Sequence, residues 1–205
     1  MYTITFEIIY KSWTLFWLVY WGFGILITWL SREKREIINL GEVVLVLITN
    51  MFWTLIALLA VSLFPLRMMT NYNILFKIIG TYLFTDIYFY HFHIMLHSPK
   101  LYKFHKMHHE FKYPYALTGL YCSVYETVFL NVFATAIGPI IFQMETPYLY
   151  LWIFTVSLNT VLTHSGNNIP FLVNDSHDKH HHTFNHNYGI SPIFDYIYGT
   201  LKIDY

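Results

Sequence analysis

Histidine is the residue type whose number and spacing in this chain could carry chemistry, with twelve in 205 residues. Eight of them fall in three clusters, of sequence HIMLH, HKMHH and HDKHH. Within a cluster the offsets are three or four residues, which on a helix bring side chains onto one face, one turn apart. Neighbouring imidazoles could then meet at one metal ion, at about 2.0–2.2 Å. The clusters are His93 and His97; His105, His108 and His109; and His177, His180 and His181.

A ninth candidate ligand is His164, which stands alone in the stretch THSGNNIP. One ion takes about four to six ligands, so nine histidines indicate two metals. The single cysteine excludes a multi-thiolate site, and imidazole suits iron, zinc, copper or nickel, among which spacing does not choose. The repeated offset disfavours the alternative of a loose, solvated histidine-rich face. His91, His182 and His186 lie off that offset and are either donors behind the ligands or ordinary polar residues.

Four other polar residues could support the ligands. Asp86 lies seven residues before His93, on roughly the same helix face, and an ionisable group within an apolar helix is costly. Its carboxylate could hold a histidine N–H, as metal-bound imidazoles generally require. Asp178 could do the same or stabilise a helix N-terminus, and Glu126 is a further candidate. Asn187 stands where the helix of the third cluster should end, so it is either a support or a stop signal.

The elements that must position these residues are apolar helices. The chain is 56% hydrophobic and only 12% charged. Two runs, Trp13–Leu30 and Val43–Phe64, carry no charge and are long enough to cross roughly 30 Å of hydrocarbon as helices. A soluble protein with unusually apolar helices is therefore the weaker alternative. The fifth segment is short, so the last two segments could form a hairpin that enters only part of the bilayer. The expected segments are Trp13–Leu30, Val43–Phe64, Ile74–Tyr90, Val124–Phe142 and Tyr148–Leu162.

The sequence therefore predicts an all-α integral membrane bundle of about four to five apolar helices, with a histidine-lined di-metal site at one end. Residues 1–205 form a single domain on this interpretation, with membrane spans in 1–72 and the histidine core in 73–205. Nine of the twelve Lys and Arg residues fall on the face that carries the histidines, which predicts that this face is cytosolic. The zero net charge gives no indication of a nucleic-acid partner, and no signal peptide is recognisable.

The order HxxxH, HxxHH, isolated His, HxxHH resembles the fatty acid hydroxylase/sterol desaturase superfamily of integral-membrane di-iron enzymes. The stretches DIYFYHFHIMLH and LYKFHKMHHEFKYPYAL are similar to the first two histidine boxes of its C-4 methylsterol oxidases. HDKHHHTFNHNYG, followed by Asp195 and Gly-Thr, resembles their third box and that of cholesterol 25-hydroxylase. The resemblance covers roughly residues 81–201.

The resemblance implies a centre of two iron ions that activates O₂, with the nine histidines as ligands. It also implies electrons from NAD(P)H through a membrane-bound cytochrome b-type partner, a lipid substrate taken from the bilayer and, in a eukaryote, the endoplasmic reticulum membrane. The expected reaction is hydroxylation of a sterol or related lipid at a C–H bond, and desaturation is the near alternative. An alternative of a different class is a histidine-rich membrane metal transporter, and a third is a catalytically inactive, lipid-binding relative.

Overall fold

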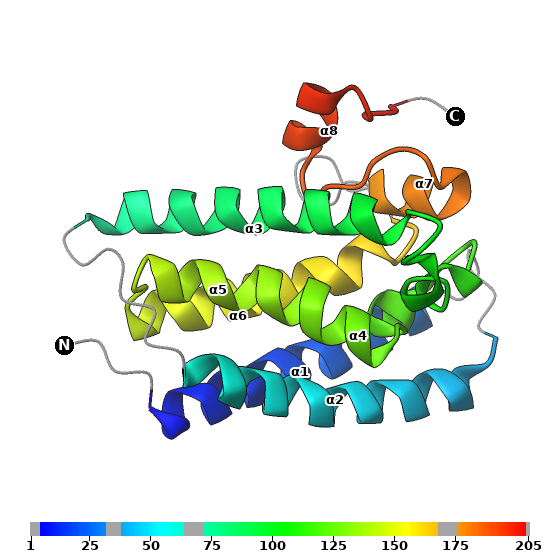
Figure 1. Cartoon of the computed structure of the whole chain (residues 1–205). Helices are drawn as coiled ribbons and strands as arrows, with labels where there is room; N and C mark the ends of the chain where they lie inside the picture. The colour runs from blue at the N-terminus through cyan, green and yellow to red at the C-terminus, as the bar shows by residue number, and fades with distance from the viewer. Residues whose placement is uncertain (1–4, 32–37, 64–71, 168–175, 204–205) are drawn as a thin grey trace.

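The computed structural model describes residues 5–31, 38–63, 72–167 and 176–203, and within them it is entirely helical. The helices pack into a bundle, with short turns between them (Figure 1). The first three helices are α1 (Phe6–Leu30), α2 (Leu40–Ser62) and α3 (Ile74–Leu96). Later come α4 (Val124–Glu126), η4 (Thr127–Val132), α5 (Phe133–Ile141), α6 (Thr146–Thr163), α7 (Ser176–Thr183) and α8 (Pro192–Tyr198). The all-α prediction is confirmed.

Helix boundaries follow from capping side chains. Thr5 accepts a hydrogen bond from the backbone N–H of Ile8 at the start of α1, and Asn73 caps α3 in the same way. These caps satisfy N–H groups that the first helical turn leaves without a partner. The predicted end of the second segment, Phe64, lies outside the described residues. The third helix continues through its histidines to Leu96.

The fourth predicted segment is one continuous helix with a wider turn in it. Val124–Glu126 is α-helical, Thr127–Val132 is a π-helix, and Phe133–Ile141 is α-helical again. Single π-turns inside α-helices are rare and concentrate at functional sites. This one directly follows Glu126, which the sequence analysis marked as a support for the ligands.

All five predicted apolar segments are helices, and three are long and apolar enough to cross a membrane within the described ranges: Phe6–Leu30, Leu40–Ser62 and Val124–Ile141. Their outer faces expose large apolar side chains, such as Leu18 on α1 and Leu45 on α2. Exposed apolar belts of this extent suit a lipid environment rather than water. The fold is that of a helical membrane protein, as the sequence predicted.

Polar side chains tie the helices to one another. Ser157 Oγ donates to the carbonyl of Phe16 at 2.7 Å, which joins α6 to α1. Thr85 Oγ1 donates to the carbonyl of Ala134 at 2.8 Å, which joins α3 to α5. Such bonds are typical of membrane bundles, where small polar side chains hydrogen-bond across helix contacts. These bonds fix how far each helix is shifted along its axis relative to its neighbour, and so they fix the positions of the residues at the helix ends.

The loop that carries the second histidine cluster is held from below by α1 and α2. Tyr20 OH donates to the carbonyl of Leu117 and accepts from the N–H of Leu120, both at 2.9 Å. Asn50 Nδ2 donates to the carbonyls of Leu120 and Cys122. These bonds reach across about seventy to one hundred residues of sequence, and they seat the loop at the end of the bundle where α3, α4 and α7 meet (Figure 1).

Candidate metal centre

The nine candidate histidines come together in two groups at one end of the bundle. Within each group the nitrogen atoms that could bind an ion all lie within 4.8 Å of one another. The first, which we name the five-histidine group, contains His93, His97, His105, His109 and His180. The second, the four-histidine group, contains His108, His164, His177 and His181. The structure thus places every predicted ligand beside others, while their binding of metal stays a prediction.

The division between the groups differs from the simplest interpretation of the clusters. Within each cluster, the two histidines that are four residues apart belong to the same group, as His105 and His109 do. The histidine three residues after the first belongs to the other group. His108 therefore joins His177 and His181, whereas His180 joins His105 and His109. The clusters interlock, and each centre depends on several separate stretches of chain.

The second cluster is not on an α-helix as the offsets predicted. His108 and His109 lie in the short 3₁₀ turn η2 (His108–Glu110), and His105 directly follows another, η1 (Tyr102–Phe104). Because these turns are brief and irregular, adjacent side chains can point in very different directions. The planes of the His108 and His109 rings are 84° apart, which sends one ring to each group.

The distances between ring nitrogens match those between ligands of a common ion. In the five-histidine group, Nε2 of His105 lies 3.0 Å from Nε2 of both His93 and His109. In the four-histidine group, Nε2 of His108 lies 3.0 Å from that of His181 and 3.3 Å from that of His177. Two imidazoles bound at about 2.1 Å and at right angles would be about 3.0 Å apart, so these spacings fit a shared ion.

Hydrogen bonds made by Nδ1, the ring nitrogen that points away from the other histidines, decide that Nε2 faces them with a lone pair. Nδ1 of His93 lies 2.7 Å from the carbonyl oxygen of Tyr188, and Nδ1 of His180 lies 2.7 Å from that of His186. A carbonyl has no proton, so Nδ1 must donate, and in a neutral ring Nε2 then carries only a lone pair. The same segment of chain orients both rings.

The four-histidine group is oriented in the same way. Nδ1 of His181 donates to the carbonyl of Phe111 at 3.1 Å, and Nδ1 of His164 donates to that of Thr160 at 2.8 Å. Inward-facing lone pairs repel one another at about 3 Å unless a cation lies between them. The donor set therefore fits a pair of metal ions, and backbone carbonyls supply the outer contacts that ligating histidines usually have.

Glu126 connects the two groups. Its carboxylate lies 2.8 Å from Nδ1 of His105 and 3.9 Å from Nδ1 of His108, so it contacts one ring of each. The side chain is 2% exposed, and a charge so deeply buried is tolerated only with partners. As a carboxylate behind a ligand, Glu126 fits the supporting role that the sequence predicted.

Burial keeps the imidazoles in the form that binds metal. It lowers the pKa of His97 to about 4, and burial with the neighbouring rings His97 and His164 lowers the pKa of His109 to about 3. Burial likewise lowers the pKa of His164 to about 4, and those of His180 and His181 well below 6.5. The rings are therefore neutral at neutral pH, so they need not lose a proton before binding an ion.

Asp86 acts one step further from the rings than the sequence predicted. Its carboxylate accepts the backbone N–H groups of Ile190 and Ser191 and the Ser191 hydroxyl, not a histidine N–H. Asp195 accepts the N–H groups of Tyr188 and Gly189, both at 2.8 Å. The Tyr188 carbonyl orients the candidate ligand His93. Asp86 and Asp195 fix the backbone of this turn, so they position His93 indirectly.

This function of Asp195 was not predicted from the sequence, where the residue stands out only as part of a motif. The position of Asp195, seven residues after Tyr188 and four before the helix-ending Gly199, was the only available signal. An Asp in the first turn of a helix is also common for another reason, because its charge stabilises the helix N-terminus. Only the contacts distinguish the two functions.

Asn187 and the end of the third-cluster helix also differ from expectation. The helix α7 ends at Thr183, and Phe184 takes a left-handed conformation with φ of 65°. Ending there lets the following backbone turn back over the rings. Asn187 bonds through its amide to the backbone N–H and carbonyl of Lys202, so it secures the C-terminal segment rather than a ligand.

The remaining marked residues have peripheral positions. Asp178 is buried in the first turn of α7, where a carboxylate stabilises a helix N-terminus. His91 is exposed, and its Nδ1 bonds to the carbonyl of Ile87 one turn earlier. His182 and His186 are half-buried, and neither belongs to the two groups, although the His186 carbonyl orients His180.

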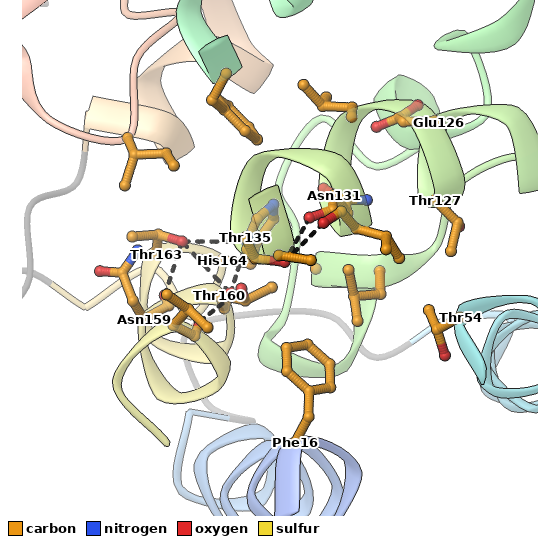
Figure 2. Close-up of a pocket in the computed structure, with 18 of the residues that line it drawn as sticks. Phe16, Thr54, Glu126, Thr127, Asn131, Thr135, Asn159, Thr160, Thr163 and His164 are labelled. Atoms are coloured by element: carbon orange, nitrogen blue, oxygen red, sulfur yellow. Dashed lines mark hydrogen bonds between the residues drawn. The ribbon is translucent and has the colours of Figure 1, made fainter. Parts of the chain in front are cut away.

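An apolar cavity of about 150 Å³ opens against both groups. Five of the nine histidines line it, together with side chains of α1, α2, η4 and α6. Figure 2 shows His164 and Glu126 near this space, with Asn131 and Thr135 on one wall, Thr160 and Thr163 on another, and Phe16 below. The lining includes several polar side chains besides the histidines, and much of the rest is hydrocarbon and aromatic rings. Such a lining suits an apolar ligand beside the candidate centre.

Comparison with known proteins identifies the class to which this fold and site belong. Residues 78–200 match the sequence profile of the fatty acid hydroxylase family, and the chain belongs to this family. The matched region contains all nine candidate ligands. No solved structure matches the chain.

Individual relatives span several enzyme names. The chain is 33% identical over 120 residues to fatty acid hydroxylase domain-containing protein 2 of Macaca fascicularis, a match that covers 58% of this chain and 36% of that protein. It is 35% identical over 140 residues to methylsterol monooxygenase 2-2 of Arabidopsis thaliana, covering 62% and 52%. It is 34% identical over 140 residues to a very-long-chain aldehyde decarbonylase of rice, with the same coverage. The chain thus spans about a third to a half of the length of these relatives.

Proposed function

We propose that the chain is an O₂-dependent di-iron lipid monooxygenase that hydroxylates a C–H bond of a sterol or related lipid. Membership of the fatty acid hydroxylase family, with relatives named for methylsterol and aldehyde substrates, supports an oxidoreductase acting on lipids. The observation that carries the finer proposal is the set of imidazole lone pairs that face one another at the wall of an apolar cavity.

Two iron ions in such a site would supply the chemistry that reduces O₂ and breaks a C–H bond, with one oxygen atom entering the lipid and the other leaving as water. The chain contributes the geometry. Backbone carbonyls and Glu126 fix the ring orientations, and the mostly apolar lining of the cavity disfavours water. The aromatic and aliphatic walls hold the hydrocarbon still so that one carbon stays beside the centre.

The reaction needs two electrons from outside the chain. We propose that they come from NAD(P)H through a membrane-bound cytochrome b-type protein, with the histidine end in the cytosol and, in a eukaryote, at the endoplasmic reticulum. Lys100, Lys103, Lys106 and Lys112 are exposed near the histidine end and could meet an acidic donor surface. The same charges also suit the ordinary excess of cations on a cytosolic face.

Metal analysis and lipid profiling test this proposal together. We expect about two irons per purified chain and a hydroxylated lipid in membranes that express the chain with its electron donor. The variant His108→Ala should stay in the membrane and form no product. An unsaturated product would indicate desaturation. Variable content of another metal, with no altered lipid, would contradict the proposal and favour transport.

A further inference from the structure

The short helix α8 leaves its outer face uncovered. The side chains on this face are large and carry no charge: Tyr196 is 78% exposed, Ile197 61% and Tyr198 54%. The one charged residue of the helix, Asp195, is 1% exposed and lies on the opposite, inner face. A continuous apolar surface of this kind is uncommon in water, and it typically marks contact with a membrane or a protein.

The position of α8 is fixed by its contact with α3. The ring of Tyr198 stacks on that of Tyr90, with centroids 5.2 Å apart, and meets the ring of His91 edge-on at 5.3 Å. His91 lies six residues before His97, or about 9 Å along the helix at 1.5 Å per residue. In Figure 1, α8 accordingly lies outside the bundle, beside α3 and close to the histidine end.

The outer face of α8 continues the exposed apolar face of α3. Leu83, Ile87 and Ile94 are four and seven residues apart, so they share one side of α3 with His91, and all three are exposed. His91 in turn contacts Tyr198 of α8. The exposed apolar surface of α3 therefore extends sideways onto α8 at the histidine end. Because large apolar side chains on the outside of this bundle suit lipid, the same lipid is the covering that the fold offers to α8.

The residue types on α8 suit the boundary between lipid and water. Tyrosine is enriched at this boundary because its ring is apolar while its hydroxyl can reach water, and Tyr196 and Tyr198 flank Ile197. Helices that lie in this boundary bury their apolar face by about 5–10 Å between the headgroups and the acyl chains. The distance of about 9 Å between His91 and the histidine end of α3 is compatible with such a depth.

The inner face of α8 reaches the turn beside the five-histidine group. Asp195 accepts the backbone N–H groups of Tyr188 and Gly189, both at 2.8 Å, and the hydroxyl of Thr200 at 2.7 Å. The carbonyl of Tyr188 lies 2.7 Å from Nδ1 of His93. A displacement of α8 would therefore displace a candidate metal ligand.

We propose that α8 lies in the membrane–water interface at the histidine end, with Tyr196 and Ile197 inserted among the lipids, and that this contact holds the turn that orients His93. The contact with lipid depends on the fold alone, whereas its effect on metal rests on the proposed di-iron function. Lipid that binds the seated form of α8 also favours, by thermodynamic linkage, the form of the five-histidine group that binds an ion.

Spin-label accessibility in phospholipid nanodiscs measures the depth of α8. Tyr196→Cys and Ile197→Cys each receive a nitroxide, and the native Cys122 is buried. Both labels should be more accessible to oxygen than to a water-soluble nickel chelate, at a depth between those of Lys103→Cys, exposed at the histidine end, and Leu18→Cys, exposed on α1. Nickel access equal to that of Lys103→Cys overturns the lipid contact. Protection from both reagents also overturns it, because protein would then cover the face.

Metal retention in the same nanodiscs tests the link to His93. Tyr196→Glu and Ile197→Glu place a charge in the interface, and a chelator should then remove the ion of the five-histidine group about tenfold faster. The release phase of this group is the one that is absent from His109→Ala. Tyr10→Glu, at an exposed tyrosine near the other end of the bundle, is the matched control and should keep the original rate.

The four-histidine group provides the internal reference, because unfolding would release both ions together. Faster release from the five-histidine group alone supports the link, and equal release rates in all variants overturn it. A chain that binds no metal in any form overturns the link together with the proposed function, while the spin labels still decide whether α8 contacts lipid.

Discussion

At the scale of single residues, the position of Glu126 accounts for the coupling of the two histidine groups. One carboxylate contacts Nδ1 of His105 in the five-histidine group and approaches Nδ1 of His108 in the four-histidine group. A negative charge behind an imidazole makes the ring a stronger ligand and fixes its orientation. Loss of that charge should therefore weaken both centres at once.

We expect Glu126→Gln to lower metal affinity by about ten- to hundredfold while the protein remains folded, because the amide keeps the shape but not the charge. Competition with a calibrated chelator measures the change. Glu110→Gln, which removes an exposed carboxylate that contacts Tyr121, is the matched control and should retain the original affinity. Equal affinity of the two variants would contradict the supporting function of Glu126.

Adjacent histidines provide a second prediction at this scale. His108 and His109 belong to different groups, so His108→Ala should empty the four-histidine centre and His109→Ala the five-histidine centre. Each variant should bind about one metal ion per chain in place of about two. Metal content per chain, measured by elemental analysis, checks this. His91→Ala alters a surface ring outside both groups, and it should leave the count unchanged.

At the scale of structural elements, the turn from His186 to Ser191 supplies two of the carbonyls that orient the five-histidine group. Asp86 from α3 and Asp195 from α8 hold this turn through its backbone N–H groups. The turn has no room for a side chain at Gly189, where an added Cβ would lie 2.5 Å from the carbonyl oxygen of Ser191. The glycine is therefore required by close packing.

Gly189→Ala should displace this turn, with a destabilisation of about 1–3 kcal/mol and a loss of metal from the five-histidine group. Thermal unfolding and metal content measure the two effects. Gly41→Ala is a suitable control, since an added Cβ there meets nothing within 4 Å and alanine favours the helix. Unchanged metal content in Gly189→Ala would show that the turn does not position the ligands.

At the scale of the whole molecule, the charges at the two ends predict an orientation in the membrane. The histidine end carries exposed lysines such as Lys103, whereas Lys11 lies near the start of α1 at the other end of the bundle. The chain has a single cysteine, Cys122, and it is buried. New surface cysteines can therefore report their side of the membrane without interference.

In sealed microsomes, whose outer face is the cytosolic one, Lys103→Cys should react with a membrane-impermeant thiol reagent and Lys11→Cys should not, because excess Lys and Arg remain cytosolic. After the membrane is permeabilised, both should react. Labelling of Lys11→Cys and not of Lys103→Cys in sealed microsomes would reverse the orientation and place the histidines outside the cytosol. The unaltered chain, with only the buried Cys122, is the background measurement.

The sequence by itself determined the helical class, the apolar segments and the nine histidines, because these depend on local periodicity and residue type. An uncharged run of about twenty residues has few stable conformations in lipid other than a helix. A histidine offset repeated in two clusters is equally local information. Membership of the fatty acid hydroxylase family follows from the same motifs.

Tertiary structure decided how the histidines divide between two groups and which backbone carbonyls orient their rings. His108 and His109 are neighbours in sequence but point to different groups, because 3₁₀ turns rather than an α-helix carry them. The carbonyls that orient His93 and His180 come from a turn about ninety residues after the first of them, and a backbone carbonyl has no signature in the sequence. The cavity beside the histidines was likewise unpredictable, because it is the space left between helices whose packing depends on contacts distant along the chain.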